Sequence, residues 1–212
     1  MRRAFTLIEL LVVMAIISIL ASILFPVFSR AIDKAKATQC LSNVKQIQLA
    51  TLMYSQDYDG WYPPGPYSYV DPNDGTTKVK IWLDTLQPYI ENYQIMVCPG
   101  EPPQTAPGPS GKLTGYAINY WMIGAGGNNA HKSSDKIVYS DASVIGDHVL
   151  WYMYNFGGTD PDPDNDPATQ GSTPDTRHME GSNFAYADGH AKWSRRDAPG
   201  VADKATAWDP EQ

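Results

Sequence analysis

The sequence predicts an α+β protein in which a long amino-terminal helix packs on a small antiparallel β-sheet head with irregular loops. Three observations lead to this prediction. Residues 5–28 form an apolar run, residues 29–58 continue it with the spacing of an amphipathic helix, and Asp188-Gly189 stands between alternating residues as in a β-hairpin. The 212-residue chain leaves room beyond residue 58 for one head domain with its own core.

The apolar run is long enough to cross a bilayer. Residues 5–28 contain one charged side chain, Glu9, and would span roughly 36 Å as a helix. Arg2 and Arg3 come before the run, so we expect this end in the cytoplasm and the head on the far side of the membrane. A carboxylate within hydrocarbon is costly unless it is paired, which favours a functional role for Glu9. The alternative is that the helix is an ordinary membrane anchor and that the Glu9 side chain extends to the membrane–water interface. Pro26 should bend or loosen the helix.

The second half of the helix should dock on the head along one face. This face is marked by residues at alternating spacings of four and three, which are Cys40, Val44, Ile47, Thr51 and Tyr54. The helix should end near Asp59-Gly60, because Pro63-Pro64 prevents its continuation. Cys40 would then lie in the seam between stalk and head, within reach of Cys98. A single disulfide is the favoured reading beyond the membrane, and two buried free thiols are the alternative.

The head is expected to alternate loops with short regular elements. Residues 60–80 are predicted to be a loop with aromatic side chains, and residues 99–115 a surface loop. Residues 81–90 suggest a short helix that turns Trp82, Leu83, Leu86 and Ile90 inward. Strand patterns cover residues 115–121, 136–141 and 148–153, and residues 194–212 are expected to form a polar tail.

The strongest local signal in the head is the hairpin around Asp188-Gly189. A two-residue turn at this position would place Tyr186 opposite Ala191 and Phe184 opposite Trp193. These four side chains would then share one face of an antiparallel sheet. We expect that face to close the core of the head.

The charge balance argues against a nucleic-acid partner. Residues 1–50 contain six Lys or Arg and two acidic residues, so their net charge is +4. Because the whole chain has a net charge of −7, the rest of the chain carries −11. An acidic head lacks the Lys and Arg that phosphate binding requires. The aspartates Asp160, Asp162, Asp164 and Asp166 could offer oxygen ligands to Ca²⁺. That segment lacks the glycine and final glutamate of an EF-hand loop, so a solvated loop is the favoured reading.

The head shows no clear catalytic motif. Asp141, His148, His178, Asp188 and His190 could be imagined as a metal or acid–base cluster, but no HExxH, paired Cys-x2-Cys or Gly-x-Ser-x-Gly accompanies them. The hairpin turn already accounts for Asp188. For His178 we favour a structural hydrogen bond to a loop carbonyl over a ligand role. The sequence therefore predicts no enzyme activity, no cofactor and no metal.

The first ten residues carry a resemblance to a known family. Ala4-Phe5-Thr6-Leu7-Ile8-Glu9-Leu10 resembles the processing and methylation signature of type IV prepilins and type II secretion pseudopilins. The resemblance implies that a prepilin peptidase cuts between Ala4 and Phe5 and that Phe5 is N-methylated. It also implies that Glu9 serves assembly and that Pro26 marks a helix kink. Ala4 stands where the family usually has glycine.

Two further stretches resemble one bacterial subfamily of these proteins. His178, nine intervening residues and Asp188-Gly189 are similar to its carboxy-terminal His-x9-Asp-Gly element. Cys40-Leu41-Ser42-Asn43-Val44-Lys45-Gln46-Ile47 is similar to a stretch on its stalk.

The resemblance implies a pilin-like organisation and a structural function. The expected parts are a leader (1–4), a transmembrane and polymerisation helix (5–28), an amphipathic stalk (29–58), a globular head (59–193) and a tail (194–212). The chain would be a filament subunit of a type IV pilus or type II secretion pseudopilus, anchored in the cytoplasmic membrane with its head outside. Its partners would be the peptidase, the membrane and other pilin or pseudopilin subunits in a homo-oligomeric filament. One alternative is a membrane-anchored protein that binds a ligand or glycan without polymerising. Another is a secreted enzyme whose ordinary signal peptide is cleaved at Ala21-Ser22.

Overall fold

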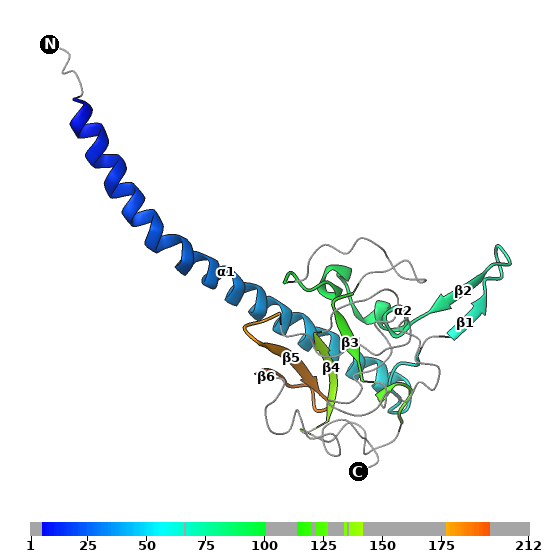
Figure 1. The fold of residues 1–212 in the computed structure, drawn as a ribbon. Coiled ribbons are helices and arrows are strands. Elements are labelled where there is room, and N and C mark those ends of the chain that lie inside the picture. Colours follow the sequence, from blue (N-terminus) through cyan, green and yellow to red (C-terminus); the bar gives the residue numbers. More distant parts are fainter. Residues whose placement is uncertain are drawn as a thin grey trace, which may run out of the picture.

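A long helix and a four-stranded sheet form the framework of the molecule. The computed structural model describes residues 6–65, 67–100, 114–119, 122–126, 134, 136–141 and 177–195. Helix α1 (Leu7–Asp57) packs with its second half on an antiparallel sheet of order β3-β4-β5-β6, and its first half projects away from the head (Figure 1). The predicted α+β layout is confirmed.

Helix α1 is one continuous element of 51 residues. It includes Pro26 without a break, and it curves gently along its length (Figure 1). The helix ends at Asp57, where the backbone N–H of Tyr58 still donates to Tyr54. Asp59 and Gly60 then take positive φ angles of 51° and 82°. The helix therefore stops beside Asp59-Gly60, as the sequence predicts, because two left-handed residues turn the chain away.

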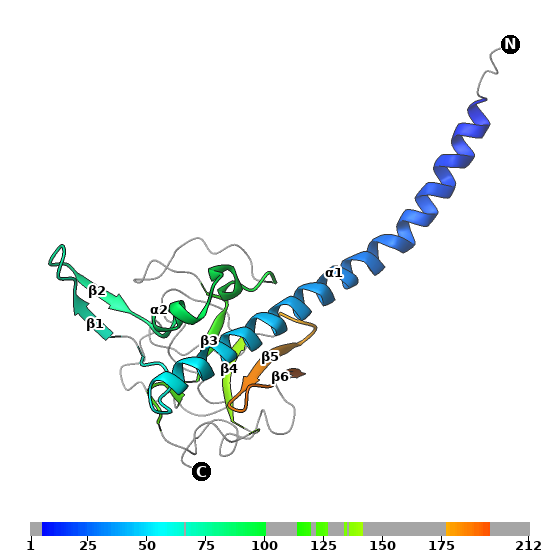
Figure 2. The same cartoon turned by 180° about the vertical axis from the view of Figure 1, so that it is seen from behind.

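The main sheet lies against the second half of α1. Its strands are β3 (Tyr116–Ile118), β4 (Ile137–Asp141), β5 (Gly181–Tyr186) and β6 (Ala191–Arg195), each antiparallel to its neighbour. Seen from behind, α1 crosses the face of this sheet (Figure 2). The strand patterns predicted at residues 115–121 and 136–141 thus correspond to β3 and β4.

The register of the β5–β6 hairpin differs from the prediction by one residue. Ala185 lies opposite Ala191 and Asn183 opposite Trp193. The loop contains three residues rather than two: Gly189 has φ 94° and donates to the carbonyl of Tyr186, as in a type I turn followed by a glycine bulge. The predicted shared face of Phe184, Tyr186, Ala191 and Trp193 is therefore wrong.

This shift changes which side chains face α1. Ala185 joins the core with Tyr139, which lies opposite it on β4, while Trp193 remains 39% exposed.

A second hairpin replaces part of the predicted loop at residues 60–80. Strands β1 (Tyr67–Val70) and β2 (Thr77–Lys80) pair in antiparallel fashion and project from the head (Figure 1). Asp71 and Asp74 accept backbone hydrogen bonds within the turn, and the Lys78 ammonium pairs with both carboxylates. The prediction of a loop is wrong here, because the turn residues 71–75 are flanked on both sides by β-forming residues that pair with each other.

Short helices fill the space between this hairpin and α1. They are α2 (Trp82–Leu86) and the 3-10 helices η1 (Gln87–Tyr89) and η2 (Tyr93–Met96). Trp82, Leu83 and Leu86 are fully buried, and Ile90 packs against the same core. The predicted inward face of residues 81–90 is confirmed.

Several predicted features lie outside the described residues. They are the cleavage site Ala4–Phe5, the strand pattern at 148–153, the acidic segment with Asp160, Asp162, Asp164 and Asp166, most of the 99–115 loop, and the chain from residue 196 onward. These features stay predictions. Strand β6 runs to Arg195, two residues beyond the expected end of the head.

Candidate functional site

The amino-terminal end of α1 is closed by a capping box. Thr6 is the N-cap, and its hydroxyl accepts a hydrogen bond from the Glu9 backbone N–H at 3.3 Å. In return, the Glu9 carboxylate accepts from both the backbone N–H and the hydroxyl of Thr6, each at 2.8 Å. The spacing Thr6-x-x-Glu9 is the sequence signal of a capping box, and sequence reasoning missed it. Glu9 therefore has a structural task in its own chain.

The first half of α1 has no apolar partner within the described part of the chain. Every large apolar side chain from Leu7 to Phe28 is between 46% and 77% exposed. This stretch is long and apolar enough to cross a membrane, and none of its most apolar window is buried in the protein. The core helix of a soluble protein would be largely buried, so a membrane span or a signal sequence fits this stretch better.

The second half of α1 buries one face in the head. The five residues predicted for this face are all buried. Tyr54 is 7% exposed, and the other four are 0% exposed. Thr51 donates its hydroxyl proton to the Ile47 carbonyl at 3.0 Å, so the Tyr139 hydroxyl is the donor in its 2.7 Å bond to Thr51. Burial raises the pKa of Tyr139 well above its usual range. The neutral phenol of β4 is thus bound directly to the helix.

Amide side chains tie the helix to backbone carbonyls of the head. The Asn43 amide donates to Val97 at 3.4 Å, and the Gln48 amide donates to Ala187 at 3.5 Å. From the sheet, the Asn183 amide donates to the Ala37 carbonyl at 3.3 Å. Sequence reasoning missed these residues because it counted apolar positions. Asn43 and Gln48 lie next to Val44 and Ile47 in the sequence. This position beside the predicted docking face was the signal that could have identified them as buried.

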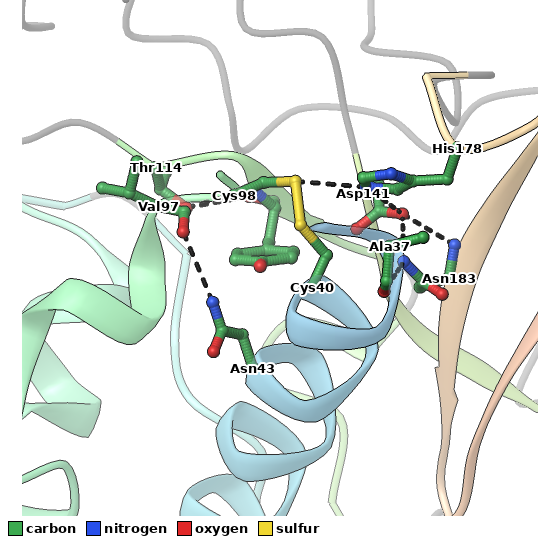
Figure 3. Close-up of a disulfide and its surroundings, with 10 residues drawn as sticks. Ala37, Cys40, Asn43, Val97, Cys98, Thr114, Asp141, His178 and Asn183 are labelled. Carbon is green, nitrogen blue, oxygen red and sulfur yellow. Dashed lines mark hydrogen bonds and ion pairs between the residues drawn. A yellow bond between two sulfur atoms is a disulfide. The ribbon is translucent and has the colours of Figure 1, made fainter. Parts of the chain in front are cut away.

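A disulfide joins Cys40 of α1 to Cys98, which follows η2. The two Cα atoms are 5.3 Å apart, and both side chains are buried (Figure 3). Residues 58 positions apart in sequence are thereby linked across the seam between stalk and head. The structure thus contains the bond that the sequence favoured, rather than two free thiols.

A histidine and an aspartate lie against this disulfide. His178 Nε2 is 3.2 Å from Cys98 Sγ and 3.6 Å from Asp141 Oδ2, and both side chains are at most 2% exposed. The Asp141 carboxylate also accepts from the backbone N–H and the amide of Asn183, at 2.7 and 2.9 Å. The described contacts of His178 Nε2 are with the disulfide and with Asp141 (Figure 3). The hydrogen bond to a loop carbonyl that the sequence favours for His178 stays a prediction.

The other imagined members of a cluster lie elsewhere or outside the described residues. Asp188 and His190 pair with each other at 2.6 Å in the β5–β6 turn. They are not part of the group formed by Cys40, Cys98, Asp141 and His178. His148 lies outside the described residues.

One comparison with known proteins bears on the amino terminus. Residues 1–25 match the family model for the prokaryotic N-terminal methylation motif. No curated protein and no solved structure matches the chain. The match does not reach His178, Asp188 or Gly189, so the subfamily with the carboxy-terminal element stays a prediction.

The motif and the exposed helix agree in what they indicate. Together they indicate anchoring in the inner membrane, and the motif favours a structural over an enzymatic role. The motif also implies processing by a peptidase and assembly with other pilin subunits. These findings support a type IV pilin-like protein.

Proposed function

We propose that the chain is a structural subunit of a type IV pilus or a type II secretion pseudopilus. A prepilin peptidase would cut between Ala4 and Phe5, Phe5 would be N-methylated, and the processed subunits would assemble by packing their α1 helices. The observation that carries this proposal is the first half of α1, which is apolar all round, exposed, and matched by the methylation motif.

An exposed helix that is apolar on every side requires an apolar environment. The membrane supplies one before assembly, and the equivalent helices of neighbouring subunits supply another afterwards. The second half of α1 is already bound to the head through Cys40, Ile47 and Thr51. Because the head is fixed to the same helix, it would lie on the filament surface once the first half of α1 has packed into the filament core.

Glu9 would link assembly to processing. In the uncut chain its carboxylate accepts from Thr6. Cleavage after Ala4 would create an ammonium group at Phe5, and the Phe5 amine of a neighbouring subunit could then pair with Glu9. Pairing would lower the cost of the carboxylate within an apolar filament core.

The orientation follows from charge and from the disulfide. Arg2 and Arg3 would hold the amino terminus in the cytoplasm, which places the head in the periplasm or outside the cell. The Cys40–Cys98 bond supports this placement because disulfides persist in oxidising compartments.

Mass spectrometry of the membrane-extracted protein tests the processing. In cells with a prepilin peptidase we expect an N-methylated Phe5 terminus. An intact leader would contradict the proposal, and loss of the whole run to Ala21 would identify a secreted protein instead. Electron microscopy of sheared filaments, labelled against the head, then separates polymerisation from simple anchoring.

Two variants separate the charge of Glu9 from its capping role. Gln at this position still completes a capping box, so Glu9→Gln removes the charge and keeps the cap. Thr6→Ala removes the cap and keeps the charge. We expect Glu9→Gln to lower filament yield at least tenfold with unchanged membrane insertion, while Thr6→Ala retains most filaments. The reverse pattern would limit Glu9 to helix capping.

A further inference from the structure

Four side chains of the types that bind metal ions meet in the seam between α1 and the head. Cys40 comes from α1, Cys98 from the segment after η2, Asp141 from the end of β4, and His178 from the turn just before β5. One ligand atom of each lies within 4.8 Å of the others, and all four side chains are buried (Figure 3). The fold, rather than any short motif, brings them together.

The spacing of these atoms suits a tetrahedral metal ion. Zinc bonds of about 2.3 Å to sulfur and about 2.0–2.1 Å to nitrogen or oxygen place neighbouring ligand atoms about 3.3–3.8 Å apart. The observed separations are 3.2 Å from Cys98 Sγ to His178 Nε2 and 3.6 Å from His178 Nε2 to Asp141 Oδ2. The second separation lies within this range, and the first would have to lengthen by a few tenths of an ångström when a metal binds.

The site also has an orienting partner for its carboxylate. Asn183 donates to Asp141 from its backbone and from its side chain, and its amide is bound to the Ala37 carbonyl as well. Such contacts fix metal-binding carboxylates and raise metal affinity. A disulfide clamp alone does not need a buried carboxylate and imidazole beside it.

We propose that Cys40, Cys98, Asp141 and His178 form a zinc site when the two cysteines are reduced. The metal would then replace the disulfide as the clamp between α1 and the head. This inference concerns the head alone and does not depend on filament formation.

The chemistry balances without a reductant, because a newly made chain carries Cys40 and Cys98 as thiols. Binding of Zn²⁺ displaces the two thiol protons to solvent and forms two zinc–thiolate bonds. A disulfide-bearing oxidant would later accept two electrons and two protons, becoming a dithiol. The two cysteine sulfurs would then bond to each other and release the ion.

A metal titration of the full-length, untagged protein in detergent tests the site. The protein is reduced with a phosphine, freed of metal, and titrated with Co²⁺ and then Zn²⁺. We expect one equivalent of Co²⁺ to give thiolate charge-transfer bands and the visible bands of a tetrahedral ion, and Zn²⁺ to abolish both. The oxidised protein should show neither. Absence of the bands in the reduced protein, or less than one equivalent bound, would overturn the proposal.

Variants show whether all four residues take part. His178→Gln and Asp141→Asn should each weaken Zn²⁺ binding at least tenfold. His190→Gln is the matched control, because His190 lies outside the group and should leave the affinity unchanged. Equal affinity in His178→Gln and wild type would refute the four-residue site. If these variants do not fold, the comparison of reduced and oxidised wild-type protein decides alone.

Discussion

The two halves of α1 share one unbroken backbone but meet opposite surroundings. From Leu7 to Phe28 apolar side chains cover every side of the helix and remain exposed. From Ala37 to Ser55 only one face is buried, and polar side chains such as Thr51 and Gln48 are buried on it with hydrogen-bond partners. The second half, called the docked half below, finds its packing and hydrogen-bond partners within the chain. The first half depends on the molecules around it.

The largest expected effect comes from removing the covalent link of the docked half. The Cys40→Ala and Cys98→Ala double variant, measured by urea unfolding in chelator, should lose about 4 kcal/mol of unfolding free energy, because the bond closes a loop of 58 residues. Wild type treated with reductant and chelator should show a similar loss. A loss below about 1 kcal/mol would mean that packing alone holds the seam together.

The second prediction compares matching residues in the two halves. Ile47 is fully buried and Ile17 is 53% exposed. Ile47→Ala should lower the unfolding free energy of the head by about 2–5 kcal/mol, because it leaves a cavity in the core.

The matched change Ile17→Ala should leave head unfolding unchanged, and its effect should appear in membrane or filament measurements. Equal destabilisation of the head by both variants would show that the first half also packs on it.

The docked half illustrates what periodicity can predict. The spacing of Cys40, Val44, Ile47, Thr51 and Tyr54 identified the buried face correctly, because a helix repeats its contacts every three to four residues. The inward face of residues 81–90 followed from the same rule. Such patterns depend only on the local geometry of the chain.

The candidate site at the seam shows where this reasoning stops. The sequence offers Asp141 and His178 as possible ligand types, but nothing near them in sequence predicts that they lie beside Cys98. Their meeting depends on the order of β3, β4 and β5, which is a long-range property. The hairpin error has a different cause, since Asp188-Gly189 is compatible with both a two-residue and a three-residue loop.

A smaller effect should follow from the turn that touches the docked half. Gly189 has φ 94°, and a Cβ there would lie 3.1 Å from Leu52 Cδ1 of α1. Gly75 in the projecting hairpin has φ 68°, and a Cβ there would meet no atom of the described residues within 4 Å. In both alanine variants, backbone strain at the positive φ angle should lower the unfolding free energy by about 1–2 kcal/mol.

Only Gly189→Ala should also disturb the helix seam, so its loss in urea unfolding should be the larger one. Equal losses would show that Leu52 yields without cost and that the turn does not help to position α1.

The buried phenol on the helix face predicts a specific loss of stability in alkali. Burial raises the pKa of Tyr139 in the folded head, whereas in the unfolded chain it should be near 10. Below pH of about 10 both states keep the proton, so the contribution of Tyr139 is fully present. As the pH rises above about 10 the unfolded state ionises first, and the unfolding free energy falls.

Tyr139→Phe should therefore lower the unfolding free energy by about 1 kcal/mol at neutral pH, because the bond to Thr51 is lost. Between pH of about 10 and 12 the unfolding free energy of this variant should fall less steeply than that of wild type. Tyr67→Phe, which removes an exposed hydroxyl on β1, serves as the control and should keep the wild-type fall. Urea midpoints at several pH values measure both slopes. An unchanged slope in Tyr139→Phe would mean that water reaches this part of the seam before the head unfolds, so that the docked half opens locally.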